Sequence, residues 1–381
     1  MRIKHGFAFK GDYITAEDNE IVLVTPGNFE IGGGFKEKKC KFFSGDYPKD
    51  YVLHADDLIV TMTDLSKQGD TLGYSARVPN SNRIYLHNQR IGLVDVFNPN
   101  ADKDYLYWFM RTPQYQKKIV ATASGSTVKH TSPSRICDVE INLPSIDKQK
   151  KIASLLTSIE KKIHISERIN DNLEQQAAAL FSSLYNRSNT EVRYTDLIQI
   201  LGGGTPKTGE TAYWNGNIAF FTPKDVGTPY TFITEKTITE EGLSHCNSRL
   251  YPVNTVFVTA RGTVGKVGLS GVPMAMNQSC YALVGKETHQ LLVYFYTLKA
   301  VDRLKHKASG AVFDAITTRD FDSEQIMKLS DDDAKAFLCV AEPMFQEILN
   351  NSIENLRLST LRDFLLPKLM SGEIDVSSVQ L

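Results

Sequence analysis

Two windows of the sequence carry side chains that could bind phosphates and read base edges, and neither window contains an acidic residue. Residues 105–137 contain no Asp or Glu but five Lys or Arg, and residues 242–286 contain four Lys or Arg. A surface that faces phosphates lacks carboxylates because these repel phosphate and must be desolvated. Ser, Thr, Asn and Gln, frequent in both windows, can contact phosphates and base edges. Both windows are therefore candidate nucleic-acid-binding surfaces; the alternative is that each lacks acids by chance.

Motifs for catalysis or nucleotide binding are missing from the sequence. The run Gly202–Gly209 is rich in glycine but lacks the G-x-x-x-x-G-K-[ST] spacing of a phosphate-binding loop, and the glycines at 32–34 fit no better. The run Asn142-Leu143-Pro144-Ser145 does not match the motif with which an amino-methyltransferase holds its target amine. No serine-nucleophile or zinc-protease motif is present. The sequence therefore favours a binding protein over an enzyme and predicts no cofactor.

Composition and cysteine usage indicate a cytoplasmic globular protein. The chain has 381 residues, of which 41% are hydrophobic and 23% charged, as in soluble proteins generally. It has no apolar run long enough to span a membrane, and its first residues lack the apolar stretch of a signal peptide. Its five cysteines include no C-x-x-C pair, which predicts free thiols and no structural zinc. The net charge of −1 argues weakly against a nucleic-acid partner, but it averages over the whole chain.

The second half of the chain repeats the first. Ile3–Lys10 aligns with Ile200–Lys207 at an offset of 197, and Thr25-Pro26 keeps this offset against Thr222-Pro223. Asn88-Gln89 aligns with Asn277-Gln278 at an offset of 189, and Ser124-Gly125 with Ser309-Gly310 at 185. The order of these weak matches is preserved, and loops of different length explain the drifting offset. The sequence therefore predicts two copies of one unit.

Each copy ends in a long helix with a heptad pattern. Residues 149–185 contain no Gly or Pro, and two seam positions repeat over about five heptads, starting at Ile152 and Leu156. The same seams recur 185 residues later. Pro343 predicts that the continuous part of the second helix begins near that residue, and Pro367 predicts a kink near its end. A 37-residue helix would span roughly 55 Å, which is typical of a spacer.

Both seams turn polar at their midpoints. Two antiparallel helices would place these midpoints opposite each other, so four polar residues could form one buried layer that fixes the register: Ser166, Asn170, Asn351 and Asn355. The alternative is that these four side chains face solvent.

The segments between the helices predict α+β modules. Short β-type runs such as 21–24, 58–60, 84–86, 91–94, 256–258 and 281–284 alternate with turn residues, and each module contains one helical stretch, over 104–120 and 291–307. The predicted organisation is a module over 1–145, a helix over 146–187, a module over 188–330, a helix over 331–372 and a tail over 373–381.

With this order of elements the chain resembles, over nearly its full length, the specificity subunits of type I restriction-modification systems. The motifs behind the resemblance are Gly203-Gly204-Thr205-Pro206-Lys207 followed by Tyr213-Trp214, the Asn277-Gln278 pair, and the C-terminal run Leu365–Glu373. The segment Tyr194–Ile198, which opens the second module, has no match before Ile3. Either the first module lacks that opening or the sequence starts inside the first module, and both alternatives stay open.

The resemblance implies a non-catalytic, cytoplasmic DNA-recognition subunit. Each module would be a target recognition domain that reads one half of a bipartite, asymmetric site in double-stranded DNA. The two helices would pair as an antiparallel coiled coil with pseudo-two-fold symmetry and space the modules. They would also bind two methyltransferase subunits, which carry S-adenosylmethionine, while restriction subunits would carry ATP and Mg²⁺. The rival readings are a coiled-coil scaffold joining two protein-binding modules and a nucleotide-dependent enzyme.

The DNA-binding residues are predicted at matched positions of the repeat. Lysines and serines suit phosphates, whereas Thr63 and Arg261 suit base edges. The alternatives are that Trp214 belongs only to the core and that Asn277-Gln278 only supports a loop. In the first module the candidates are Lys10, Thr61, Thr63, Asn88, Gln89, Ser124, Ser126 and Lys129; in the second they are Lys207, Tyr213, Trp214, Thr259, Arg261, Asn277, Gln278 and Ser309.

Overall fold

The computed structural model describes residues 1–38, 40–227, 229–307 and 315–376. The chain forms two compact units. Unit 1 comprises Met1–Ile163 and the described part of Arg357–Leu381, and unit 2 comprises His164–Leu356. Each unit therefore combines one module with parts of the same two long helices, α4 (Ile146–Arg187) and α9 (Asp331–Ser371).

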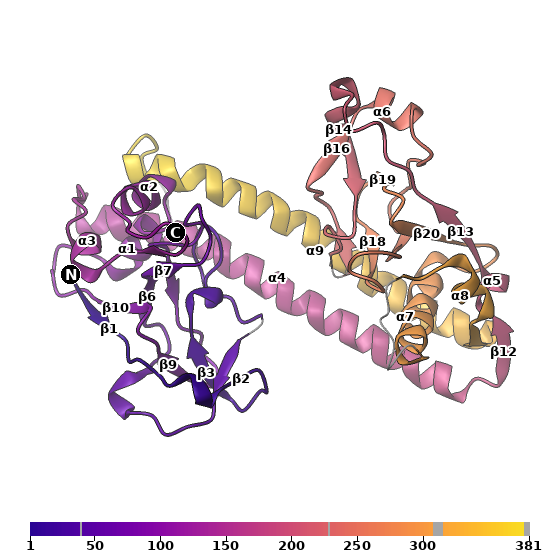
Figure 1. Cartoon of the computed structure of the whole chain (residues 1–381), viewed down its shortest axis with the longest axis horizontal. Helices are drawn as coiled ribbons and strands as arrows, with labels where there is room; N and C mark the ends of the chain where they lie inside the picture. The colour runs from indigo at the N-terminus through magenta and orange to yellow at the C-terminus, as the bar shows by residue number, and fades with distance from the viewer. Residues whose placement is uncertain (39, 228, 308–314, 377–381) are drawn as a thin grey trace. The chain divides into compact units, whose positions relative to one another are not determined.

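The module of unit 1 contains a four-stranded sheet in the order β1-β10-β6-β8, a five-stranded sheet in the order β2-β4-β3-β9-β5, and the pair β11-β7. Short helices pack beside the first sheet (Figure 1). The strands are β1 (Arg2–His5), β2 (Ile14–Thr15), β3 (Ile21–Val24), β4 (Lys41–Phe43), β5 (Val52–Leu53), β6 (Leu58–Thr61), β7 (Thr63–Asp64), β8 (Ser75–Arg77), β9 (Ile84–His87), β10 (Ile91–Asp95) and β11 (Lys129–His130); the helices are α1 (Lys103–Phe109), α2 (Pro113–Ala121) and α3 (Pro133–Cys137).

The module of unit 2 contains a five-stranded sheet in the order β13-β20-β17-β18-β15, a three-stranded sheet in the order β16-β14-β19, and the pair β12-β21. Its largest module helix is α7 (Gln290–Lys307), most of whose apolar side chains are buried. The strands are β12 (Thr190–Arg193), β13 (Ile198–Gly202), β14 (Trp214–Phe221), β15 (Tyr230–Thr231), β16 (Lys236–Ile238), β17 (Val256–Thr259), β18 (Val267–Ser270), β19 (Met274–Met276), β20 (Cys280–Gly285) and β21 (Gln325–Lys328); the shorter helices are α5 (Tyr194–Leu197), α6 (Glu240–Ser244) and α8 (Thr318–Ser323).

The strand registers reproduce the offsets found in the sequence. β1 pairs with β10 as β13 pairs with β20, with Ile3 opposite Val94 in one module and Ile200 opposite Leu283 in the other. The parallel pair β3-β9 likewise corresponds to β14-β19. Both comparisons give offsets of 197 and 189, so the duplication extends to the hydrogen-bonded register. The prediction of two α+β modules, each followed by a long helix, is confirmed.

The long helices pack together through the predicted seams. In unit 2, Arg187 of α4 forms an ion pair with Asp333 of α9, and Asn170 bonds to Asn351 and Ser352. Residues later in α4 thus meet residues earlier in α9, so the helices are antiparallel. None of the twenty predicted seam side chains is exposed, as expected for residues that fill one helix-helix interface.

The continuous part of the second helix does not begin near Pro343 as expected, because α9 begins at Asp331 and passes through both prolines. A proline inside a helix costs about 3 kcal/mol. On either side of Pro343, however, Phe337, Ala341, Phe345 and Ile348 are buried in the core of unit 2, and next to Pro367, Leu366 and Leu369 are buried in unit 1. Ser330 caps the helix by accepting the Asp333 N–H, and Gly372, with φ +79°, follows its last residue.

The helical stretch predicted over 104–120 is two helices. α1 ends at Phe109, and α2 begins at Pro113 with Thr112 as its N-cap, whose hydroxyl accepts the Tyr115 N–H at 3.2 Å. Proline favours the first turn of a helix, where its missing N–H costs nothing. The break at 110–112 follows from this start signal.

Polar side chains of α4 and α9 meet at the midpoints of the seams in unit 2. Asn351 Nδ2 donates to Asn170 Oδ1 at 3.0 Å, and Asn170 Nδ2 donates to Ser352 Oγ at 3.3 Å. Ser166 is buried, and Asn355 Oδ1 is buried without a hydrogen-bond partner. Because these polar groups match one another in only one alignment of the helices, we propose that they fix the helix register.

Candidate nucleic-acid interface

The four segments that carry the predicted residues of the first module come together at one end of its main sheet. Phe7 N donates to His87 O at 2.8 Å, Met62 N donates to Arg90 O at 2.9 Å, and Thr131 N donates to Met62 O at 3.0 Å. These bonds join the segments after β1, after β6, between β9 and β10, and around β11. We call this surface edge 1, made of residues 6–10, 61–63, 87–90 and 124–131.

The second module builds the same edge with equivalent bonds. Gly204 N donates to Met276 O at 3.1 Å, Ala260 N donates to Ser279 O at 2.8 Å, and Ile316 N donates to Ala260 O at 2.9 Å. We call this surface edge 2, made of residues 203–207, 259–261, 276–279 and 315–316. The two modules thus place matched segments in one arrangement.

Each edge depends on a glycine that the candidate list lacked. A Cβ on Gly6 would lie 2.1 Å from Asn88 O, and one on Gly203 would lie 2.2 Å from Asn277 O. Both distances are far inside van der Waals contact, so only glycine permits this approach. Gly6 and Gly203 align in the repeat, and that match was the signal that could have identified them.

Several predicted DNA-binding side chains are buried, and their role as direct contacts is corrected. Thr61 and Thr259 are 0% exposed, and their hydroxyls donate to Thr63 O and Thr263 O. Thr63 is also buried, with its hydroxyl 3.2 Å from His130 Nδ1. DNA cannot reach these side chains in this conformation, so they support the backbone of the two edges.

The asparagines predicted at matched positions hold the turns of the edges. Asn88, which is buried, accepts the Arg90 N–H at 3.1 Å through Oδ1. Asn277 accepts the Ser279 N–H at 3.0 Å in the same way. The buttressing alternative therefore describes both residues, and the neighbouring Gln89 and Gln278 are exposed.

The remaining candidates present polar or charged groups at the surface. Ser124, Ser126 and Lys10 are exposed in unit 1, as are Lys207 and Arg261 in unit 2, and Lys129 is half-buried. Among the residues that the structure describes, Lys10, Lys207 and Arg261 have no ion-pair partner. Ser309 lies outside the described residues. The exposed groups are donors of the kind that contact phosphates and base edges.

The aromatic pair of the second module organises the loop of edge 2. Trp214 Nε1 donates to Lys207 O at 3.2 Å, and the Trp214 ring packs edge-on against Phe220 at 5.5 Å. Tyr213 stacks on His245 with ring centroids 4.9 Å apart. Trp214 thus positions Lys207 from a half-buried site.

The acidic residue that follows edge 1 in the sequence, Asp64, has its side chain directed into the protein. Asp64 follows Thr63 and is buried. Burial alone would raise the pKa of the Asp64 carboxyl, but hydrogen bonds from Thr71 and Ser66 lower this pKa below its usual value. Asp64 therefore keeps its charge and orders the loop 66–71 by accepting hydrogen bonds from within the protein.

The acid-poor window 105–137 is only partly a surface. Tyr105, Tyr107 and Trp108 are core residues, and Arg111 is buried against Glu160 at 2.5 Å. Acids are scarce there partly because α1 and α2 face the core. Lys129 and the serines at 124 and 126 are the part of the window that reaches edge 1.

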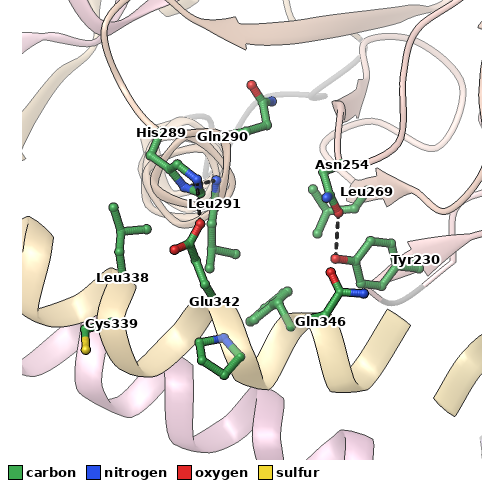
Figure 2. A pocket seen from close by; sticks show the side chains of 12 residues that line it. Tyr230, Asn254, Leu269, His289, Gln290, Leu291, Leu338, Cys339, Glu342 and Gln346 are labelled. Atoms are coloured by element: carbon green, nitrogen blue, oxygen red, sulfur yellow. Dashed lines mark hydrogen bonds and ion pairs between the residues drawn. The ribbon is translucent and has the colours of Figure 1, made fainter. Parts of the chain in front are cut away.

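Unit 2 also has a pocket of about 410 Å³ between its module and α9 (Figure 2). His289 Nε2, just before α7, lies 2.7 Å from Glu342 Oε1 of α9, and the Tyr230 hydroxyl donates to Asn254 Oδ1 at 2.8 Å. Asn254 precedes β17, whereas Arg261 follows its other end. The pocket therefore belongs to the packing of the module on α9 and is not part of edge 2.

No group of three or more His, Cys, Asp or Glu side chains within the described ranges could hold a metal ion. In the same ranges, no helix is long and apolar enough to cross a membrane.

Comparison with known proteins gives one consistent result. A family model described as the type I restriction modification DNA specificity domain matches residues 3–175 and again 186–328. The HindI specificity subunit of a type I restriction enzyme from Haemophilus influenzae is 24% identical, over 87% of this chain and 93% of the relative. The MjaIX specificity subunit from Methanocaldococcus jannaschii is 32% identical over 31% of this chain and 29% of the relative.

A solved structure shares the fold. The crystal structure of a type I restriction-modification S subunit from M. genitalium superimposes with a TM-score of 0.61 at 15% identity, covering 96% of this chain and 92% of that chain.

Proposed function

The chain belongs to the family of type I restriction-modification DNA specificity subunits, and on that premise we propose that edge 1 and edge 2 each read one half of a bipartite DNA site. The observation that carries this proposal is the repetition of one hydrogen-bonded edge in both modules. The exposed groups on the two edges differ, since Arg261 is exposed where the first module has the buried Thr63. Edges of equal shape but different chemistry suit a site whose halves differ in sequence.

Methylation profiling of the chain assembled with its methyltransferase subunits tests this function. The expected result is modification at one asymmetric sequence with a central gap of fixed length. Modification without sequence preference, or at a site that is not divided in two, would contradict it. The adenine methylation itself, with S-adenosylmethionine, and ATP-driven cleavage are assigned to partner chains, so this chain is proposed to catalyse nothing.

We further propose that α4 and α9 set the gap between the half-sites. The test inserts four residues after Glu167 in α4, between Ser166 and Asn170, and four more after Glu354 in α9, between Asn351 and Asn355. The helices then lengthen by about 6 Å. The expected result is a recognised gap longer by about one to two base pairs, since base pairs are spaced by about 3.4 Å. Methylation profiling measures the gap, and an unchanged gap in an assembled complex would contradict the ruler role.

The exposed apolar side chains of the helices are the proposed contacts with methyltransferase subunits. In unit 1, Leu361 and Phe364 of α9 are 45% and 57% exposed, and their spacing of three puts them on one face of the helix. Large exposed apolar groups mark protein interfaces. We expect Leu361→Glu with Phe364→Glu to prevent co-purification of one methyltransferase subunit, because charges would be buried in the contact. The double variant Arg357→Glu with Asp363→Lys is the control, and equal loss in both would refute the assignment.

A further inference from the structure

The two modules share a tyrosine that occupies one structural position. Tyr13 ends the 3-10 turn Gly11–Tyr13, and Tyr213 ends the 3-10 turn Thr211–Tyr213. The carbonyl of Tyr13 accepts the Ser44 N–H at 3.0 Å, and that of Tyr213 accepts the Thr239 N–H at 3.1 Å. Each donor is the first residue after the equivalent strand, β4 or β16. The tyrosines are therefore counterparts, although insertions shift their sequence offset to 200.

Each tyrosine lies close to an unpaired lysine of its edge. Tyr13 N donates to Lys10 O at 3.4 Å, which places Lys10 at the start of the turn. In the second module Glu210 N donates to Lys207 O and Tyr213 N donates to Glu210 O, both at 3.2 Å, so Lys207 is one turn further away. Within the described residues, neither phenolic hydroxyl has a hydrogen-bond partner and neither ammonium group has an ion-pair partner.

In unit 1 this corner opens into a cleft of about 470 Å³ that adjoins edge 1. The cleft is lined by Phe7, Lys10, Tyr13 and one acidic residue, Asp46, among others. Phe7 and Tyr13 are 40% and 46% exposed. Phe7 also belongs to edge 1, where it bonds to His87 and Gln89 through its backbone. The ring of Tyr13 rests on Gly45, where a Cβ would lie 2.7 Å from the Tyr13 Cγ. This packing fixes the position of the Tyr13 ring in the lining of the cleft.

The same two side-chain types, a lysine and a tyrosine, recur at matched positions in both modules. Such a repeated pair suits a chemical group that is present in both half-sites. The halves of an asymmetric site differ in their bases but have the same sugar-phosphate backbone. A lysine ammonium and a tyrosine hydroxyl are both donors that proteins use on phosphate oxygens, and such contacts set position without reading sequence. Building on the proposed function, we propose that Lys10 with Tyr13, and Lys207 with Tyr213, each hold a DNA backbone phosphate and so set the register of each edge on the duplex.

The test uses Tyr13→Phe and Tyr213→Phe in the complex with methyltransferase subunits, because these changes remove only the hydroxyls. Each variant is expected to weaken binding about tenfold, since a hydrogen bond to a charged group is lost. The loss should be equal on cognate and non-cognate DNA. Lys10→Gln and Lys207→Gln should each reduce the slope of log affinity against log salt by about 0.9. Tyr47→Phe is the control, because Tyr47 packs against the hydrophobic cluster that contains Phe43, the ring next to Tyr13, but does not line the cleft.

Three outcomes would overturn the proposal. An altered base preference at one half-site would mean that the tyrosines read sequence. Normal DNA affinity with weaker assembly would mean that the shared target is the methyltransferase. Unchanged affinity and assembly would mean that the hydroxyls contact neither partner. The unmodified complex separates this proposal from the proposed function: if it shows no sequence preference, the proposed function fails, whatever the tyrosine variants do.

Discussion

Arg111→Ala is expected to destabilise unit 1 by about 3 kcal/mol, because it removes the buried guanidinium that bonds to both Tyr107 and Glu160. This is the lower end of the range for breaking a buried ion pair, since Arg362 remains 3.9 Å from Glu160. Arg111 is 5% exposed, and its Nη1 lies 2.5 Å from Glu160 Oε1 of α4 and 2.5 Å from the Tyr107 hydroxyl. That hydroxyl donates to Glu160 Oε2 at 2.9 Å. The cluster ties α1 to α4, so its loss should loosen the module from the helix.

The electrostatics of the cluster support a large effect. Burial raises the pKa of the Tyr107 hydroxyl well above its usual range, so that this group stays protonated and can donate. Burial would lower the pKa of the Arg111 guanidinium, but Tyr107 and Glu160 raise it above its usual value. Both groups therefore keep their protons near neutral pH, and the effect of Arg111→Ala should not vary with pH there.

Urea unfolding measures the change in the free energy of unfolding. Monitoring the unfolding by hydrogen exchange of the α1 and α2 amides assigns that change to unit 1. Arg83→Ala is the matched control, because it removes a partly exposed pair with Asp18 at 2.6 Å, and such a pair contributes about 1 kcal/mol or less. Arg111→Met combined with Glu160→Leu should recover much of the stability, since an apolar replacement of a buried ion pair is often neutral. A loss as small as that of Arg83→Ala would show that the cluster does not anchor the module.

Arg261→Ala is expected to relax base preference at one half-site by roughly 5- to 150-fold and leave the other half-site intact, as removal of a bidentate guanine contact worth about 1 to 3 kcal/mol requires. Arg261 is exposed. Its backbone is fixed by the bond from its N–H to Ser279 O at 3.2 Å and by the bridge to Ala315. The side chain therefore leaves edge 2 from a defined position.

Methylation profiling over a library of DNA sites measures the preference at each position. Lys335→Ala is the control, because it removes one positive charge from α9 in the same unit, away from edge 2. An equal loss at both half-sites would show that Arg261 supplies only general charge, and an unchanged profile would remove it from the interface.

Much of the fold was predictable because the patterns that encode it are local. The heptad seams follow from the helical period, so their burial could be read without knowing any distant contact. The β-runs named from the sequence correspond to β6 and β10 of the first main sheet and to β17 and β20 of the second. The prediction for Pro343 was wrong because the outcome depends on distant contacts. The helix continues through Pro343, since the burial of its neighbours on both sides outweighs the local cost of proline.

The candidate site was predictable only as a set of segments. The repeat placed Gly6, Thr61 and Asn88 in one module against Gly203, Thr259 and Asn277 in the other, and all six lie at the edges. Which side chains of those segments face outward was not encoded in their types. Tyr13 was missed because loop insertions shift it by three residues from the offset that identified Lys10.

The sequence by itself determined that this protein is a duplicated pair of α+β modules and helices, with polar midpoints in the helical seams. Heptad periodicity and internal repetition can be recognised from the order of residues along the chain, without any knowledge of distant contacts. The tertiary structure alone decided that Thr61, Thr63 and Arg111 point inward while Arg261 stays at the surface. Those outcomes depend on partners far away in sequence, such as His130 for Thr63 and Glu160 for Arg111. A polar side chain is buried only where folding brings it such a partner.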